Sequence, residues 1–332
     1  MSTILGNPIT LGGGGLELVA NVANGATVTA TLGSKTVTGV SVGGQARLKI
    51  PQEGKWTVSA TNGSQASIPQ KIDVSVPVTV DFALPSQELN DTSWEAIKHV
   101  SDANMGANFW SVGDCKEVTM NGKVSDGLTL TNYSAWVYII GFNHNAEREG
   151  NGIAFQGFKA TKNGTPVCLT DSGYDNNKER GIWFNMNNTS TNSGGWQASL
   201  MRKNIMPLIK AAFPADLRAV IKPSTIFTTQ GQGNGACTAT EDDVFLLAEY
   251  EVFGTRTNAS TQEPNYLKQY SYYSAGNSKV KYRHNATSST AYWWLRSPYD
   301  KDSVFVCYVG PSGGISYNGA SISEGVAPCF KV

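Results

Sequence analysis

The hydrophobic pattern of the chain changes period at Pro85-Ser86, and this change limits the possible folds more than any other feature. Before it, apolar and polar residues alternate in short runs that are separated by turn dipeptides such as Asn24-Gly25 and Asn62-Gly63. Such alternation predicts short strands with one buried face, at residues 16–22, 26–33, 35–42, 46–50, 55–61 and 77–84. We therefore expect a small antiparallel β-sandwich of Ig-like type over residues 16–85, with Trp56 in its core.

Residues 1–85 carry no group of acidic, basic and nucleophilic side chains that could perform chemistry. Residues 1–15 end in the glycine run 12–15, which predicts a flexible or docking arm. An attachment or spacer function is therefore the expectation for this part of the chain.

From residue 86 onward, helical and strand patterns are mixed. Helical spacing of apolar residues predicts helices at 93–102, 199–213, 215–221 and, as a further candidate that Gly276 would end, 265–276. One of residues 90–92 is placed to cap the first of them. Strand patterns occupy residues 117–120, 122–124, 134–142, 152–158, 181–186, 305–310, 313–318 and 325–330. This mixture predicts an α+β domain over residues 86–332.

The overall charge excludes several kinds of partner. Twenty-six Lys and Arg residues balance 26 Asp and Glu residues, so no net field attracts nucleic acid or an anionic membrane. No segment is long and apolar enough to span a bilayer, and the N-terminal residues lack the basic and apolar regions of a secretory signal. We therefore expect a protein that is made in the cytosol without a signal peptide and that binds neither nucleic acid nor membrane.

No residue pattern indicates catalysis. His99, His144 and His284 are isolated, the five cysteines include no C-x-x-C pair, and the common hydrolase and phosphate-binding motifs are absent. Two acidic stretches leave alternatives open. Residues 171–179 are either a solvated loop or a Ca²⁺ site, and residues 241–243 are a cap, a solvated edge or the carboxylate pair of a glycosidase. We expect no enzyme activity, no metal and no cofactor.

Residues 299–324 follow the aromatic stretch Tyr292–Trp294 and differ from it in composition. Tyr, Ser, Gly, Asp and Asn dominate, and these are the residue types of binding loops. A Gly/Ser-rich hairpin without a binding function would have the same composition. The aromatic stretch should be buried and residues 299–303 exposed, so the junction between them separates a predicted scaffold from a predicted site.

Five stretches of the second part carry a resemblance to a known family, at residues 192–223, 241–254, 270–279, 292–298 (YWWLRSP) and 325–330 (GVAPCF). Together they resemble a domain family of unassigned name that is common in phages and prophages of gut Gram-positive bacteria. The resemblance covers nearly all of residues 86–332. Members are similar to C-type lectin-like variable proteins, whose genes a retroelement diversifies by mutating adenines of an Asn-rich template.

The resemblance implies a fixed frame and a variable segment, residues 299–324. The frame, which would be the scaffold of the site, comprises Trp293, Trp294, Leu295, Arg296, Ser297, Pro298, Phe305, Val309, Gly313, Gly325, Val326, Pro328 and Phe330. The ligand-binding positions would be Tyr299, Asp300, Asp302, Ser303, Tyr308, Ser312, Ser316, Tyr317, Asn318, Ser321 and Ile322. Lys301 and Glu324 do not fit as diversified Asn codons, because adenine changes in such a codon yield neither residue. Ala327 and Cys329 also depart from the family, which often has Arg or Ala there.

The resemblance further implies a fold and a function. Residues 86–332 would form a C-type lectin-like domain in a homotrimeric receptor-binding protein of a phage tail tip. The sandwich would attach to other tail or baseplate proteins of the virion, and the ligand would be a glycan or protein of the host cell surface. Two alternatives stay open. One is a head or tail decoration protein that binds glycans or mucin, and the other is an oxidase similar to formylglycine-generating enzymes, for which Cys307 and Cys329 would have to meet.

Overall fold

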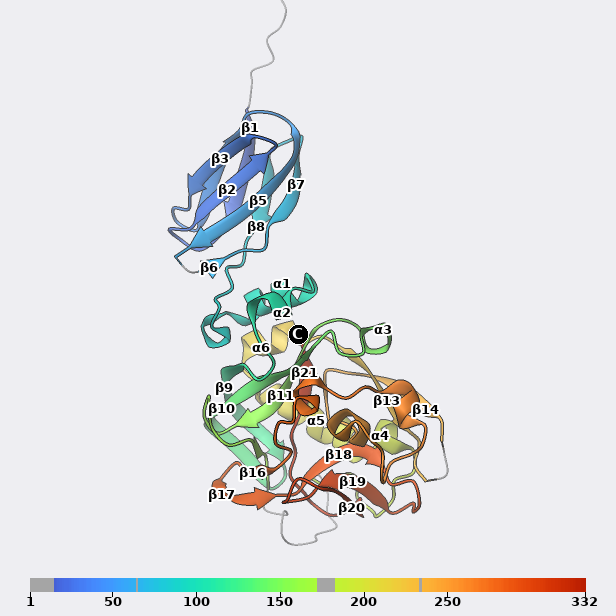
Figure 1. Ribbon diagram of the computed structural model, residues 1–332. Coiled ribbons are helices and arrows are strands. Elements are labelled where there is room, and N and C mark those ends of the chain that lie inside the picture. The colour runs from blue at the N-terminus through green and yellow to red at the C-terminus, as the bar shows by residue number, and fades with distance from the viewer. Residues whose placement is uncertain (1–14, 64, 172–182, 233–234) are drawn as a thin grey trace, which may run out of the picture. The chain divides into compact units, whose positions relative to one another are not determined.

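The computed structural model describes residues 15–63, 65–171, 183–232 and 235–332. The chain divides into two compact units, Met1–Gln87 and Glu88–Val332 (Figure 1). The division falls just after Pro85-Ser86, where the sequence pattern changes period.

Two regions that the sequence singled out fall largely outside the described residues. Of the predicted arm at 1–15, only Gly15 is described, and of the acidic stretch 171–179, only Asp171. Within the described ranges, no helix is both long and apolar enough to cross a membrane.

The first unit contains two sheets of short strands. One has the order β4-β1-β8 and the other the order β3-β2-β5-β6, with β7 paired to β5. The strands are β1 (Leu16–Asn21), β2 (Thr27–Leu32), β3 (Lys35–Val40), β4 (Gln45–Ile50), β5 (Gly54–Asn62), β6 (Gln65–Ala66), β7 (Gln70–Val74) and β8 (Val78–Asp81).

One pairing of the first unit differs from the prediction. β1 and β8 pair in parallel, whereas the other ladders of this unit are antiparallel. The expectation of a purely antiparallel sandwich is therefore wrong here, because the chain reaches β8 from the other sheet and no hairpin sets its direction. Strands β6 and β7 were not predicted from the sequence.

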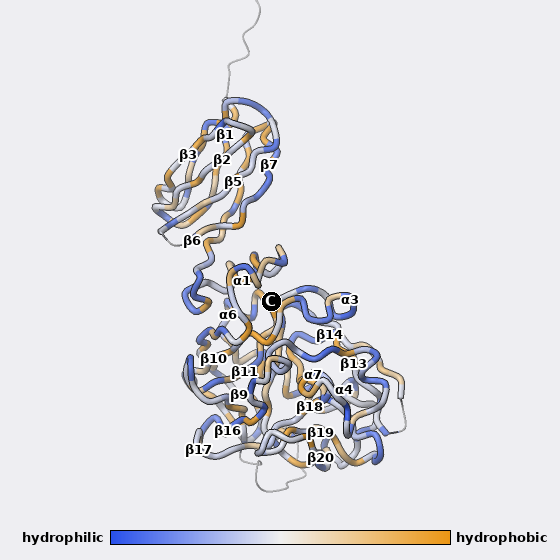
Figure 2. The backbone as a smooth tube through the Cα atoms, viewed as in Figure 1, coloured by the Kyte–Doolittle hydropathy of each residue, from blue (hydrophilic) through white to orange (hydrophobic). Residues whose placement is uncertain are grey.

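Alternating side chains build the core of the first unit. In β4, Ala46, Leu48 and Ile50 are buried and the residues between them are exposed. Figure 2 shows the same alternation of hydrophobic and hydrophilic residues along β2 and β5. Trp56 is fully buried among these side chains, and its Nε1 donates to the carbonyl oxygen of Gln52 at 3.1 Å. The predicted core position of Trp56 is confirmed.

The second unit is β-rich and is built around an antiparallel sheet of order β15-β21-β11-β10-β9. Its strands are β9 (Cys115–Ser125), β10 (Leu128–Phe142), β11 (Ile153–Lys159), β15 (Val244–Phe245) and β21 (Cys329–Lys331). The prediction of two separate strands at 117–120 and 122–124 is wrong, because β9 runs continuously through Asn121-Gly122 and the turn lies at Asp126-Gly127. Gly122 absorbs the irregularity there with a φ of 126°.

Three smaller sheets complete the strands of this unit. They are β12 (Val167–Cys168) with β16 (Lys281–Arg283) and β17 (Ala286–Ala291), the hairpin of β13 (Ser224–Thr229) and β14 (Cys237–Asp242), and the sheet of β18 (Trp293–Pro298), β19 (Phe305–Val309) and β20 (Ile315–Gly319). The strand predicted at 181–186 is wrong for its described part, since residues 183–186 make only one isolated bridge, between Asn185 and Ser323.

The helices of the second unit are short. They are η1 (Leu89–Asp91), α1 (Trp94–Asp102), α2 (Gly106–Phe109), α3 (Ala146–Glu149), α4 (Gly195–Ala198), the π-helical turn η2 (Met201–Ile205), α5 (Met206–Ala212), α6 (Ala215–Val220), α7 (Glu249–Phe253), α8 (Glu263–Tyr266) and α9 (Ser271–Ser274). The predictions at 93–102, 199–213 and 215–221 are confirmed. Ser93 caps α1 in place of residues 90–92, which lie in or beside η1.

The single helix predicted at 265–276 is wrong. Two helical turns, α8 and α9, lie there, and Leu267 and Tyr270 between them are extended. The amide of Tyr270 donates to the carbonyl of Glu251 in α7, so a tertiary hydrogen bond replaces the helical one. Gly276 follows α9 with a φ of 84°, as expected of a residue that ends a helix.

Candidate functional site

The frame of the site is the strand β18, of which every residue is buried. Trp293 and Trp294 are fully buried, as predicted. Each indole N–H finds a backbone carbonyl, that of Lys279 for Trp293 and that of Phe184 for Trp294, at 2.9 and 2.8 Å. Both rings are therefore fixed by packing and by a hydrogen bond.

Arg296 connects β18 to neighbouring segments through its side-chain hydrogen bonds. Its side chain is fully buried and forms two bonds of 2.6 Å to the carboxylate of Glu251 in α7. The guanidinium also donates to the carbonyl of Leu246 and to the hydroxyl of Thr228 in β13. Burial opposes its charge, but the Glu251 carboxylate outweighs this and raises the pKa of Arg296 above its usual value.

Gly325 closes the frame. It pairs with β18 through hydrogen bonds to Tyr292 and Trp294. A Cβ at this position would lie 2.4 Å from the sulfur of Cys168 and 2.6 Å from the carbonyl oxygen of Tyr292. Only glycine allows this close approach, which agrees with its predicted place in the scaffold.

The loop of residues 299–305 is held by its backbone. The side-chain amide of Asn192, which is buried, lies 2.8–3.1 Å from the carbonyl oxygens of Tyr299, Asp302 and Phe305. The backbone N–H of Asn192 donates to the carbonyl of Ser303, and the side-chain amide of Gln232 donates to the carbonyl of Lys301. Among the side chains at 299–303, that of Asp302 also contributes, because its carboxylate accepts from the backbone N–H of Val304 at 3.1 Å. The other contacts described here are made by the loop backbone.

Three aromatic side chains gather on this loop and the hairpin beside it. The rings of Tyr299 and Tyr317 stack with centroids 4.0 Å apart, and Phe305 lies 5.2 Å from Tyr317 and 6.1 Å from Tyr299. Tyr317 is 39% exposed, and the other two are half-buried. We call Tyr299, Phe305 and Tyr317 the aromatic cluster. Phe305 was predicted to belong to the fixed frame, and the structure places it in this cluster instead.

The strand alternation of β19 and β20 divides the predicted ligand-binding positions between two faces. Tyr308 lies opposite Trp294 and Ser316, so these three side chains share a face, whereas Tyr317 lies opposite Cys307 on the other. Asn318 follows Ser316 on the Tyr308 face, and its amide donates to the carboxylate of Glu324. β20 is the edge strand of its sheet, which leaves both faces partly accessible.

The remaining predicted positions differ in exposure. Ser303 and Ser312 are exposed, whereas Asp300, Asp302 and Ile322 are half-buried. Ser321 is fully buried and lies 2.7 Å from the hydroxyl of Ser190, so its place on the binding face is wrong. Its hydroxyl is satisfied inside the protein, because the segment 187–193 covers it.

Two residues near the site were misread or missed by sequence reasoning. Tyr292 was predicted to be buried with the two tryptophans, but it is 38% exposed and lies 5.2 Å from Tyr308. Asn192 was missed because it stands in a run of Asn, Thr, Ser and Gly. No local signal distinguishes it from Asn187 or Asn188.

A buried charge network lies behind the frame. His144, Glu149 and Glu251 bring possible metal-ligand atoms within 4.8 Å of one another. Glu251 is already bound to Arg296, and Glu149 to the ammonium of Lys331 at 3.1 Å. Burial lowers the pKa of His144 to about 3, so its imidazole is neutral. A divalent cation would add charge to a balanced group, and we interpret the network as structural.

Glu263, at the start of α8, is fully buried beside this network. Neither of its carboxylate oxygens has a hydrogen-bond partner among the described residues. Burial raises the pKa of the Glu263 carboxyl to about 8. The group is therefore largely protonated at neutral pH, where a charge without a partner would be costly.

We expect Glu263→Gln to gain stability relative to the unchanged protein as the pH rises from about 4.5 to 8. The folded state keeps a proton in this window that the unfolded state releases, so the unchanged protein loses about 1.4 kcal/mol of unfolding free energy per pH unit. Glutamine does not titrate. Urea unfolding of both proteins across this window measures the difference, and a pH-independent difference would contradict the assignment.

The oxidase and glycosidase alternatives each require a particular pair of side chains, and neither pair is present among the residues named for it. Cys307 lies in β19 and Cys329 in β21, which belong to separate sheets, and both are free thiols whose pKa burial raises far above the usual range. Asp242 and Asp243 each bind a cation, Arg202 and Lys210, at 2.6 Å. Neither a cysteine pair nor a free carboxylate pair is therefore formed by these residues.

Residues 177–332 match a family described as a domain of unknown function (DUF6273). The matched range includes Asn192, the aromatic cluster and the whole of β18–β20. No curated protein and no solved structure matches the chain.

Proposed function

We propose that this chain is a receptor-binding protein of a phage particle, in which residues 299–324 bind a molecule of the host surface. The observation that carries the proposal is the backbone-held loop of residues 299–305. Because Asn192 and Gln232 bind its carbonyl oxygens, the side chains at 299, 300, 301 and 303 can change without loss of these contacts. Asp302 is the exception, since its carboxylate accepts from the backbone N–H of Val304. A binding site that differs between relatives needs such a separation between frame and contact residues.

The aromatic cluster supports a binding role. Tyrosine contributes rigid, amphipathic contact area at low entropic cost, and it is enriched among residues that dominate binding energy. Tyr299 and Tyr317 stack on each other beside a sheet whose strand β18 holds the buried side chains of Trp293, Trp294 and Arg296. Rigid support of this kind lowers the entropy that is lost on binding.

The finer parts of the proposal follow the sequence resemblance. The second unit would be a C-type lectin-like domain, and the first an Ig-like domain that attaches to other tail or baseplate proteins. Three copies would bind together, so that weak single sites give useful avidity. The host ligand would be a glycan or a protein of the cell surface.

The test compares a double variant of the aromatic cluster with a variant of a half-buried tyrosine outside residues 299–324. Labelled protein is first screened for binding to intact cells of gut Gram-positive bacteria, and a strain that binds is used for the variants. Tyr299→Ala/Tyr317→Ala should reduce the affinity at least 30-fold, since one such anchor contributes roughly 2 kcal/mol. Tyr250→Ala, which alters a half-buried tyrosine of α7, is the control and should bind as the unchanged protein does.

Melting curves must show that both variants stay folded. Undiminished binding by the folded double variant would contradict the receptor-binding proposal. A decoration protein, which binds glycans or mucin through another surface, would then be the better reading.

A further inference from the structure

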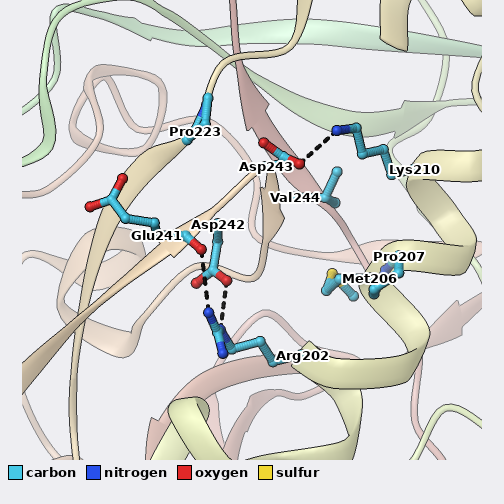
Figure 3. A pocket seen from close by; sticks show the side chains of 9 residues that line it. All are labelled: Arg202, Met206, Pro207, Lys210, Pro223, Glu241, Asp242, Asp243 and Val244. Atoms are coloured by element: carbon cyan, nitrogen blue, oxygen red, sulfur yellow. Dashed lines mark hydrogen bonds and ion pairs between the residues drawn. The ribbon is translucent and has the colours of Figure 1, made fainter.

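A pocket of about 420 Å³ lies in the second unit between the helical run η2–α5 and the strands β14–β15 (Figure 3). None of its residues belongs to the segment 299–324. It is lined by Arg202, Met206, Pro207, Lys210, Pro223, Glu241, Asp242, Asp243 and Val244. The residues form two ion pairs with apolar side chains between them, as Figure 3 shows.

At one end of the pocket, Arg202 is held in a fixed orientation. Its Nε donates to Asp242 at 2.6 Å, and an Nη donates to the carbonyl of Glu241. Asp242 is buried and accepts two further bonds, from the indole of Trp196 and the hydroxyl of Thr240. The other Nη of Arg202 has no acceptor among the described residues, so a planar N–H pair remains for a ligand.

The segment that carries Arg202 is itself unusual. Residues 201–205 form a π-helical turn, which is rare and is found frequently at functional sites. The turn and the buried Asp242 act on the same side chain.

At the other end, Lys210 and Asp243 form a pair at 2.6 Å whose side chains are 31% and 37% exposed. One oxygen of Asp243 is bound to Lys210, and the second has no donor among the described residues. This end can therefore accept a hydrogen bond from a cationic group of a ligand.

Between the two ends the surface is apolar. Met206, Pro207 and Val244 lie there, with Pro223 on the rim (Figure 3). Arg202 and Lys210 are eight residues apart on the helical run, which corresponds to about 12 Å at the rise of an α-helix. An extended peptide advances about 3.3–3.6 Å per residue, so three or four residues would span this distance.

We propose that this pocket binds a short zwitterionic peptide of three or four residues with an apolar side chain in its middle. The peptide carboxylate would bind Arg202, its ammonium group would bind Asp243, and the side chain would pack on Met206 and Val244. The three acidic residues of the lining disfavour a purely anionic ligand, and its two basic residues disfavour a purely cationic one. A ligand with both charges matches both ends.

The peptide itself provides the first test, because its changes leave the protein intact. Binding of Gly-Leu-Gly to the full chain is measured by calorimetry beside its N-acetylated form, its C-amidated form and Gly-Gly-Gly. We expect each of the three altered peptides to bind at least tenfold more weakly, since each loses one of the three contacts. Equal binding of all four peptides, or no binding of Gly-Leu-Gly, would overturn the proposal.

A protein variant then locates the site. Asp243→Asn should weaken the binding of Gly-Leu-Gly at least tenfold. It should also reduce the difference in affinity between Gly-Leu-Gly and its N-acetylated form. Asp216→Asn, an exposed aspartate of α6 outside the pocket, is the matched control and should have no effect. Undiminished binding by folded Asp243→Asn would place the peptide elsewhere and overturn the assignment. Cell binding through residues 299–324 is a separate measurement and stays unaffected.

Discussion

Trp294→Ala should lower the free energy of unfolding of the second unit by about 3–5 kcal/mol, as expected when a fully buried tryptophan is truncated. The change removes the ring that packs against Tyr308 and the hydrogen bond to the carbonyl of Phe184. The carbonyl of Phe184 would lose the shorter of its two hydrogen bonds and keep the one from the Glu324 N–H, at 3.3 Å.

Asp300→Ala is the control for this prediction. Its side chain makes no hydrogen bond among the described residues, and its amide N–H, which binds Asn258, is retained. We expect a change within about 0.5 kcal/mol. Calorimetric unfolding of the full chain measures both variants. Equal effects would contradict the division into a buried frame and a tolerant loop.

Arg296→Met should lower the free energy of unfolding by about 3–5 kcal/mol, because it leaves Glu251 as a buried charge without its partner. Leu246 and Thr228 also lose their donor. The loss of stability comes mainly from the unpaired Glu251 carboxylate that remains, and much less from the lost attraction between the two groups.

Adding Glu251→Gln to Arg296→Met tests this reason. The amide removes the unpaired charge and can still accept from the backbone of Ala248, which binds Glu251 at 2.8 Å. The double variant should therefore recover at least half of the lost stability in urea unfolding. A double variant less stable than Arg296→Met alone would show that packing, and not charge, explains the cost.

Local periodicity explains what the sequence could predict. Alternation and turn dipeptides located most strands of the first unit, and helical spacing located α1, α5 and α6. The buried tryptophans of β18 were predicted because they stand in a dense aromatic stretch, Tyr292–Trp294. Each of these features is decided by residues that lie close together along the chain.

The errors concern contacts between distant segments. Ser321 has the composition of a binding loop, yet the segment around Ser190 covers it. The helix predicted at 265–276 is broken because Tyr270 binds the backbone of Glu251. The aromatic positions fall on two faces, because the register of β19 and β20 assigns each side chain to one side. None of these is readable from composition.

The position of β21 has a consequence for biosynthesis. β11 pairs with β21 in the interior of the main sheet, and Phe155 faces Phe330 across about half the length of the chain. Contacts so far apart in sequence make folding slow. During translation, β10 and β11 emerge from the ribosome long before their last partner strand, and residues 299–324 are made in that interval. This segment is thus synthesised while the sheet is only partly folded and the edge of β11 is unpaired. Apolar substitutions in the segment would then favour aggregation. Selection on its side chains then acts during folding as well as on the finished surface.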